Sequence, residues 1–191
     1  MPVQAVTTWY LEQRSPADLR PARTPQSPLQ ITRAEIPSPE LSRFLYTSIG
    51  GHWQWRDRLV WTYERWMQWL DRPQVQTWVM VVSGIPAGYV ELEKQPGDEV
   101  EIAYFGVHKD FLGRGLGGHL LTAGIERAWD MGAKRVWVHT CSLDHPAALA
   151  NYQARGMTIY KEETVRKDVP ESQPGPWPGA FVVPPPPAGG G

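Results

Sequence analysis

The sequence is poor in cysteine, in net charge and in long apolar runs. A single cysteine among 191 residues excludes an intramolecular disulfide and a cysteine-based zinc site, so a reducing compartment is favoured. The net charge is −1, which argues against a general nucleic-acid binder and against an anionic membrane surface as partner. No apolar stretch approaches the roughly 18 residues of a membrane span, and the first residues lack a signal-peptide pattern. We therefore expect a cytoplasmic globular protein without nucleic-acid or membrane partners.

Proline and tryptophan, by contrast, are abundant, with 19 and 10 copies. The prolines concentrate towards the two ends, which predicts three segments. Residues 1–28 hold an N-terminal strand and a proline-rich connection, and residues 29–168 form the folded domain. Residues 169–191 form a Pro/Gly-rich tail that we expect to be disordered, because it has little apolar surface to bury. A polyproline ligand for a partner protein is the alternative interpretation of this tail.

Alternating strand and helix patterns predict a mixed α/β fold. A capping serine followed by proline predicts one helix starting at Ser38-Pro39. Apolar spacing alone predicts a second helix around Tyr63 to Leu70. Two later helices are expected before Gly132 and over residues 146–155. The strand order around them predicts one sheet with helices on its faces. The predicted strands are residues 7–14, 29–35, 77–82, 87–93, 99–107, 135–141 and 157–163.

A glycine-rich turn follows the strand at residues 99–107 and opens a helix. It reads Phe-Leu-Gly-Arg-Gly-Leu-Gly-Gly over residues 111–118. Glycines allow a tight bend and a close approach of a ligand to the backbone. The first-turn N–H groups of a helix lack partners and carry the positive end of its dipole, which suits a pyrophosphate. Arg114 adds a positive charge, and a flexible loop with a helix cap is the alternative interpretation.

The same turn formally matches the dinucleotide fingerprint G-x-G-x-x-G at Gly113, Gly115 and Gly118. Five residues separate the strand from the first glycine, however, and the next strand ends without an Asp or Glu for a ribose hydroxyl. A Walker loop is excluded because no Gly-Lys-Ser/Thr follows. A nicotinamide-dependent enzyme is therefore a remote alternative.

Residues 107–118 resemble the acyl-CoA pyrophosphate loop of the GNAT N-acetyltransferase superfamily, whose pattern is Gln/Arg-x-x-Gly-x-Gly/Ala. Gly115 and Gly117 match the two small positions, whereas Leu112 stands where Gln or Arg is usual. Residues 148–157 are similar to the family's Ala-x-x-x-Tyr-x-x-x-Gly-Phe segment, and His145 falls where Asn is common. The resemblance covers roughly residues 77–163.

This resemblance implies a mixed, mostly antiparallel central sheet with helices on both faces, in a GNAT-like acyltransferase fold. It also implies acetyl-CoA as co-substrate, no metal, and transfer of acetyl to a primary amine of a small molecule or protein. A non-catalytic acyl-CoA-binding regulatory module is the alternative, and a homodimer stays open. The implied coenzyme-binding residues are Phe105, Gly106, Val107, Leu112, Gly113, Arg114, Gly115, Leu116, Gly117, Gly118, His145, Ala148 and Tyr152.

Attack on a thioester requires a neutral amine, so a general base near the acceptor is expected. We predict Glu101 as this base and Glu91 as the second choice, with a solvated strand charge as the alternative for each. Strand alternation predicts that Glu101 shares a face with Ala103 and Phe105.

The remaining catalytic roles follow from the resemblance. It implies that Tyr152 protonates the leaving sulfur, although a core aromatic is the alternative for this residue. The N–H groups around Phe105, Gly106 and Val107 would stabilise the developing negative charge, and Gly106 would allow a bulge there.

Aromatic residues crowd the segment between and within the first two helices. The resemblance places this region beside the acceptor pocket, and Trp53 and Trp55 are the candidate substrate-binding residues. Aromatic rings could receive an apolar or a cationic amine. Trp66 shares the apolar helix face with Met67 and Leu70, so we assign it to the core.

Overall fold

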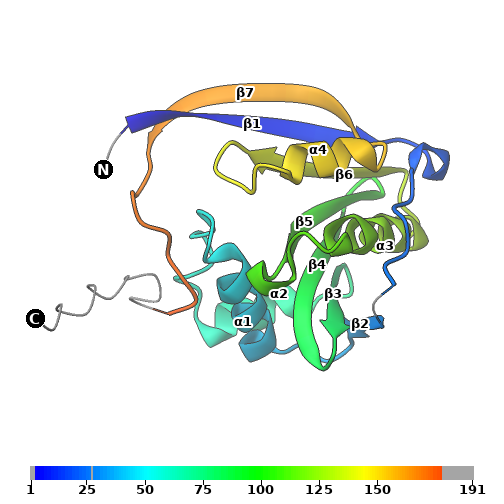
Figure 1. The fold of residues 1–191 in the computed structure, drawn as a ribbon, viewed down its shortest axis with the longest axis horizontal. Coiled ribbons are helices and arrows are strands. Elements are labelled where there is room, and N and C mark those ends of the chain that lie inside the picture. Colours follow the sequence, from blue (N-terminus) through cyan, green and yellow to red (C-terminus); the bar gives the residue numbers. More distant parts are fainter. Residues whose placement is uncertain (1–2, 27, 178–191) are drawn as a thin grey trace, which may run out of the picture.

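The computed structural model describes residues 3–26 and 28–177, which form one seven-stranded sheet with helices on both faces (Figure 1). The strands are β1 (Val3–Gln13), β2 (Leu29–Ala34), β3 (Val75–Val82), β4 (Ile85–Gln95), β5 (Glu99–Val107), β6 (Arg135–Cys141) and β7 (Thr158–Asp168). The α-helices are α1 (Pro39–Gly50), α2 (Tyr63–Leu70), α3 (Leu116–Asp130) and α4 (Ala148–Ala154), and single 3-10 turns lie at Pro16–Asp18 and Lys109–Phe111.

The strand order is β2-β3-β4-β5-β6-β1-β7. Neighbours are antiparallel except β5 and β6, which run parallel. The predicted mixed, mostly antiparallel sheet with helices on both faces is therefore confirmed.

The expected cap begins α1, and a cap that the sequence analysis did not predict begins α2. The Ser38 side chain accepts a hydrogen bond from the Leu41 N–H at the start of α1, and Pro39 occupies the first helical position. Thr62 caps α2 in the same way, by accepting from the Arg65 N–H. Each cap satisfies an N–H group that has no partner inside the helix.

The two faces of the sheet carry separate parts of the core. Helices α3 and α4 pack with Met80 and Val90 on one face. Helix α1 packs with Val79 and Tyr89 on the other face. Adjacent residues of β3 and β4 thus point to opposite faces, as the two-residue period of a strand requires. Trp66 of α2 is buried, as expected for a core residue.

Strand β1 lies inside the sheet, between β6 and β7 (Figure 1). It pairs antiparallel with both, so that Thr8 stands opposite Cys141 on one side and Glu163 on the other. Val6 and Leu11 are fully buried. The predicted boundary at residue 28 therefore separates this strand from the strands with which it pairs.

Residues 169–177 run back from β7 and pack against the loop between α1 and α2. The Gln54 Nε2 donates to the Pro170 carbonyl at 3.1 Å, and the Gly175 N–H donates to the Gly51 carbonyl at 2.9 Å. Val169 is buried. This part of the tail, for which we expected disorder, thus makes defined contacts, whereas residues 178–191 lie outside the described residues.

A β-bulge interrupts the pairing of β4 with β5. Ile102 pairs with Leu92 and Tyr104 pairs with Glu91, so Ala103 is the extra residue. The expected alternation is therefore wrong: Ile102 and Phe105, three residues apart, both pack on the α3 side of the core, so Glu101 and Phe105 lie on opposite faces. We expected this bulge at Gly106, but it lies three residues earlier. Gly106 is instead needed because Ile49 of α1 lies against its Cα.

We predict that Gly106→Ala destabilises the protein by about 1–3 kcal/mol, because the new methyl group would lie 2.4 Å from Ile49 Cγ2. Urea unfolding measures the change. Gly117→Ala is the matched control, since its methyl group would meet its nearest neighbour, Val107 Cγ2, at an ordinary 3.7 Å. The double variant Gly106→Ala/Ile49→Ala should lose less unfolding free energy than the two single variants lose together. Strict additivity would show that this contact is not the cause.

Candidate functional site

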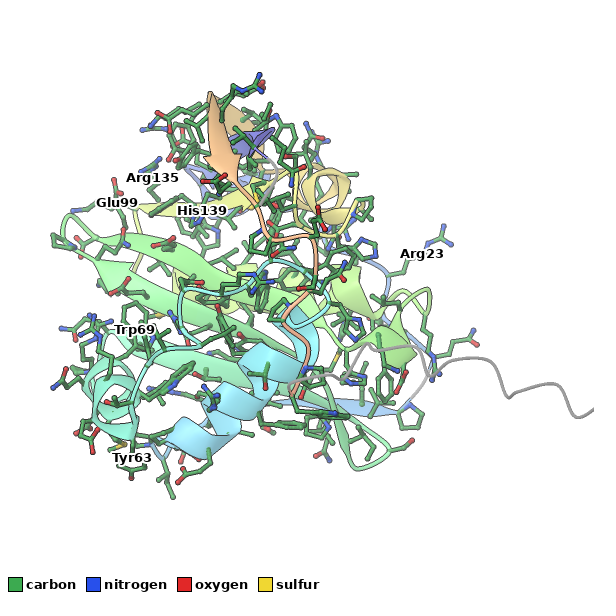
Figure 2. All side chains as sticks on the ribbon, turned by 90° about the vertical axis from the view of Figure 1, so that its left-hand side faces the viewer. Arg23, Tyr63, Trp69, Glu99, Arg135 and His139 are labelled. Carbon is green, nitrogen blue, oxygen red and sulfur yellow. The ribbon has the colours of Figure 1, made fainter. Side chains whose placement is uncertain are left out.

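A cavity of about 840 Å³ opens where β5 and β6 move apart. The two strands pair only over Glu99 to Glu101 of β5 and Arg135 to Trp137 of β6. Glu99 and Arg135 form an ion pair at 2.9 Å within this paired part, and Figure 2 shows them close together. Beyond it, the ends of both strands line the cavity instead of bonding to each other.

The turn between β5 and α3 forms one wall of the cavity. Gly113 and Gly115 have φ angles of +75° and +74°, a region that favours glycine. No atom lies within 4 Å of the position of a side chain at either residue, and Gly115 begins α3 without a side-chain cap. The first N–H groups of α3 are therefore open to a ligand. The lining residues of this wall are Leu112, Gly113, Gly115, Leu116, Gly117 and Gly118.

Arg114 is not among the residues that line the cavity. Its Nη2 donates to the Asp110 carbonyl at 2.9 Å, and its guanidinium lies over the Phe111 ring. The structure thus keeps the backbone of the predicted phosphate turn at the cavity but directs this positive charge elsewhere.

The open edge of β5 supplies further N–H groups. The His108 N–H bonds to the Ala87 carbonyl of β4 at 2.8 Å. Because bonding directions alternate along a strand, the N–H groups of Phe105 and Val107 point away from β4, toward the gap left by β6. Phe105, Gly106 and Val107 all line the cavity.

Tyr152 of α4 is a buried phenol at the cavity. Its ring packs edge-on against Phe105, with centroids 5.9 Å apart, and its hydroxyl makes no hydrogen bond with the described residues. Burial raises the pKa of Tyr152 well above its ordinary value, and Asp144 adds to the shift. The phenol therefore holds its proton at neutral pH. His145 and Ala148 also line the cavity.

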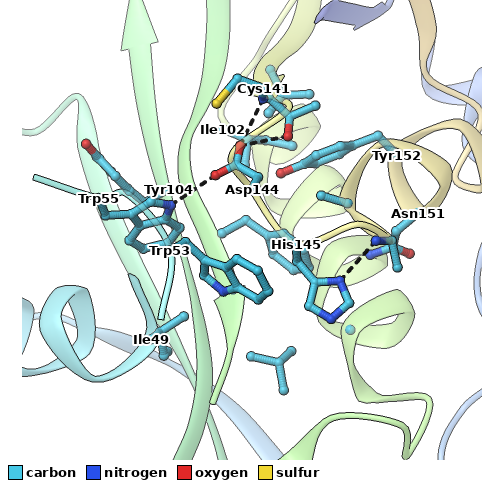
Figure 3. A pocket seen from close by; sticks show the side chains of 18 of the residues that line it. Ile49, Trp53, Trp55, Ile102, Tyr104, Cys141, Asp144, His145, Asn151 and Tyr152 are labelled. Atoms are coloured by element: carbon cyan, nitrogen blue, oxygen red, sulfur yellow. Dashed lines mark hydrogen bonds between the residues drawn. The ribbon is translucent and has the colours of Figure 1, made fainter. Parts of the chain in front are cut away.

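Two aspartates that the sequence analysis did not single out face the cavity. Asp57 accepts hydrogen bonds from the hydroxyl groups of Tyr46, at 2.7 Å, and Tyr104. Asp144 accepts from the Thr140 hydroxyl at 2.8 Å and from the Trp55 Nε1 at 3.3 Å (Figure 3). No motif marks either residue, because the loops that hold them are brought together only by the fold.

Both predicted substrate-binding tryptophans lie at the cavity. Trp55 packs edge-on against Tyr104, with centroids 4.9 Å apart. Trp53 packs edge-on against His145 at 5.0 Å. Through Asp144 and His145, the loop after α1 thus contacts the loop before α4 (Figure 3).

Glu101 lines the cavity at the last residue pair before the strands separate. It accepts a hydrogen bond from the Gln95 Nε2 at 2.7 Å, and its second oxygen lies 3.3 Å from the His139 Nδ1 of β6. This contact raises the pKa of His139. Glu101 and His139 therefore form a carboxylate–imidazole pair across the two strands.

Glu91 is not brought to the cavity. It is buried and accepts from the Arg58 guanidinium at 2.8 Å and from the Trp69 Nε1 at 2.9 Å. Burial raises the pKa of the Glu91 carboxyl, and Arg58 counteracts the shift. The Arg58 guanidinium in turn lies within 4.6 Å of the ring centroids of Trp61, Trp69 and Tyr104. Glu91 thus anchors the arginine around which these rings pack.

The described residues contain no group of three or more His, Cys, Asp or Glu side chains that could hold a metal ion. None of their helices is long and apolar enough to cross a membrane. Burial raises the pKa of the Cys141 thiol, which disfavours the reactive thiolate.

The fold and the cavity are accompanied by a match to a known protein family. The acetyltransferase (GNAT) family matches residues 36–157, well over half of the chain. The chain belongs to this family, and the resemblance of its glycine-rich turn and α4 segment is confirmed.

Individual relatives agree with this assignment. The chain is 40% identical over 65 residues to a mycothiol acetyltransferase of Corynebacterium aurimucosum, a match that covers 34% of this chain and 21% of that protein. It is similar in fold to a GCN5-related N-acetyltransferase of Sphaerobacter thermophilus, with a TM-score of 0.59 and 17% identity over 86% of this chain and 53% of the other.

A GCN5-related N-acetyltransferase of Kribbella flavida gives the same TM-score of 0.59 and identity of 17%, over 84% of this chain and 56% of its own. The chain thus spans about a fifth of the curated relative and about half of each solved structure.

We predict that Arg58→Met destabilises the protein by about 3–5 kcal/mol, because it leaves the Glu91 carboxylate buried without its partner. The folded variant should bind a proton at Glu91 more readily than the unfolded chain does. The loss of unfolding free energy should therefore be smaller at about pH 5 than at about pH 8. Urea unfolding at both pH values measures it.

The matched control is Arg72→Met, because the Arg72 side chain bonds Glu93 at 2.8 Å but is 35% exposed. Partly exposed pairs contribute about 0–1 kcal/mol. Similar losses in both variants would show that burial of the Arg58–Glu91 pair has no special importance.

Proposed function

We propose that this protein is an acetyl-CoA-dependent N-acetyltransferase that moves an acetyl group to a primary amine by direct attack. The observation that carries the proposal is the composition of the cavity. Unpaired N–H groups from α3 and β5 line one part of it, and carboxylates with aromatic rings line another. The first part suits a pyrophosphate and a thioester, and the second suits an amine.

The residues present fit coenzyme A. A side chain at Gly113 or Gly115 would project into open space beside the first turn of α3, so the glycines leave room for a phosphate to reach the backbone. These N–H groups would hold the pyrophosphate, and the edge of β5 would bond the amide-rich arm of the coenzyme. When bound, acetyl-CoA supplies an acetyl group activated as a thioester.

Three groups of this chain would perform the proton transfers and stabilise charge. Glu101 would take the proton that the amine loses as its nitrogen bonds to the acetyl carbon. The N–H groups of Phe105 and Val107 would bond the acetyl oxygen while it gains negative charge. The Tyr152 hydroxyl would give its proton to the sulfur when the carbon–sulfur bond breaks, which leaves an amide and a free thiol.

The setting of the reaction is part of the same proposal. The single Cys141 and the use of acetyl-CoA favour the cytoplasm, and the acceptor is an amine of a small molecule or protein rather than a nucleic acid. A homodimer is compatible with this function but is not required by it, because one chain supplies every residue of the cavity described above.

We predict that Gly115→Ala weakens acetyl-CoA binding at least about 10-fold, because alanine disfavours the φ of +74° that turns the first α3 amides to the cavity. Isothermal calorimetry with acetyl-CoA measures this. Gly84→Ala is the matched control: its φ is +80° at the β3–β4 turn, which does not line the cavity. Both variants should lose some stability, but only Gly115→Ala should lose affinity. Equal acetyl-CoA affinities of the two variants would show that this turn does not bind the phosphates.

We further predict that Glu101→Gln and Tyr152→Phe each lower the rate of acetyl transfer by about 100-fold or more, with acetyl-CoA binding retained. Release of the free thiol in the presence of a panel of primary amines measures the rate. The control is Glu93→Gln, which lies opposite Glu101 in β4 but does not line the cavity. Acetyl-CoA binding without turnover of any amine would favour the non-catalytic, acyl-CoA-binding regulatory module instead.

A further inference from the structure

Acidic side chains outnumber free cations where β5, β6 and the loop after α1 line the cavity. Three carboxylates line it: Asp57 from the loop after α1, Glu101 from β5 and Asp144 from the loop after β6. They come from three separate segments, so the fold gathers them at one place. The basic side chains that line the cavity, among the described residues, are Arg58, His139, His145 and Lys167.

Arg58 does not neutralise these carboxylates. Its guanidinium is held by Glu91 at 2.8 Å, and aromatic rings cover it. Asp57 and Asp144 bond instead to neutral donors, namely tyrosine and threonine hydroxyls, an indole N–H and a backbone N–H. Such donors hold a carboxylate in place and leave its charge uncompensated. Lys167 is therefore the one permanently charged cation, among the described lining residues, that is not already in an ion pair.

The three carboxylates act together on the imidazole of His139. Its pKa is raised first by the hydrogen bond to Glu101, and the charges of Glu101, Asp144 and Asp57 raise it further. The other groups that face His139 are the rings of Tyr10 and Trp137, at about 6 Å. All three carboxylates thus stabilise a positive charge at this one position of the cavity wall (Figure 2 labels His139).

Aromatic faces accompany the carboxylates. Trp53, Trp55 and Tyr104 line the same part of the cavity. An ammonium group gains from both an aromatic face and a carboxylate, and the effect grows where water is excluded. A carboxylate brought in by the ligand would add a fourth negative charge to this wall, where Lys167 is the one permanently charged side chain, among the described lining residues, without a carboxylate partner.

We propose that the acceptor is a cationic amine that carries no carboxylate on the carbon next to its amino group, with its apolar part against Trp53, Trp55 and Tyr104. This inference rests on the proposed function and narrows its acceptor class. It separates simple arylalkylamines and carboxyl-blocked amino compounds, which the cavity should accept, from free α-amino acids, which it should reject.

A matched series of three ligands tests this inference. Phenethylamine, phenylalaninamide and phenylalanine share the ring and the amino group, and only phenylalanine has a carboxylate. Calorimetry with the CoA-loaded protein, which cannot react, should show that the first two bind at least about 10-fold more tightly than phenylalanine. Equal or tighter binding of phenylalanine would overturn the inference, and so would a failure of all three amines to bind.

The failure of the proposed function is distinguishable, because it would appear as absence of CoA binding before any amine is added, or as acetyl-CoA binding without turnover of any amine. Asp144→Asn and Asp57→Asn then identify the source of the selectivity. Each should reduce the preference for phenethylamine over phenylalanine by at least about 3-fold with CoA binding retained, because Asn keeps an acceptor oxygen but removes the charge.

Asp130→Asn is the charge-matched control, since Asp130 pairs with Arg127 at the end of α3 and does not line the cavity. An unchanged preference in both cavity variants would overturn the assignment to Asp57 and Asp144. Should Asp57→Asn lose CoA binding with its tyrosine contacts, Asp144→Asn and the wild-type series still decide the question.

Discussion

The structure depends on the separation of two parallel strands. β5 and β6 share only three residue pairs before they part, and from that point each leaves one row of backbone groups without a strand partner. An unpaired N–H in a protein interior is costly, so a fold keeps such a row only where a ligand or water can satisfy it. The cavity, the open edge of β5 and the junction of Glu101 with His139 all follow from this separation. The chain belongs to the GNAT acetyltransferase family, and we propose that acetyl-CoA is the ligand that pairs with the open edge of β5.

The sequence predicted the parts of this arrangement that local physics controls. The bounds of β5 and β6 were predicted to the residue, because strand alternation and turn residues mark both ends. The glycine-rich turn was equally readable, since only glycine adopts its positive φ angles without strain. The bulge at Ala103 was not, because an alanine within a regular alternation gives no sign of an extra residue. Asp57 was missed for a related reason: its partners Tyr46 and Tyr104 lie on other elements, and no spacing connects them.

Glu91 illustrates how one buried charge can organise a wall of the cavity. Its carboxylate holds Arg58, and the guanidinium then serves as the flat centre on which Trp61, Trp69 and Tyr104 pack. A sequence shows only that a glutamate alternates with apolar residues, and such a residue is equally consistent with a base at the surface. The choice between the two roles depends on whether an arginine reaches it, which is a property of the three-dimensional packing.

The position of β1 has a consequence for how the molecule folds. Thr7 bonds to Ser142 and Thr164, which stand 135 and 157 positions further along the chain. The central position in this half of the sheet is thus occupied by the first of the seven described strands, whereas its two neighbours, β6 and β7, are the last two along the chain. Closing loops of this length costs entropy before any contact repays it, which slows folding. Until β1 has paired with β6, the outer edge of β6 stays open to strands of other nascent chains. The sheet is complete only when β1 has paired with both β6 and β7.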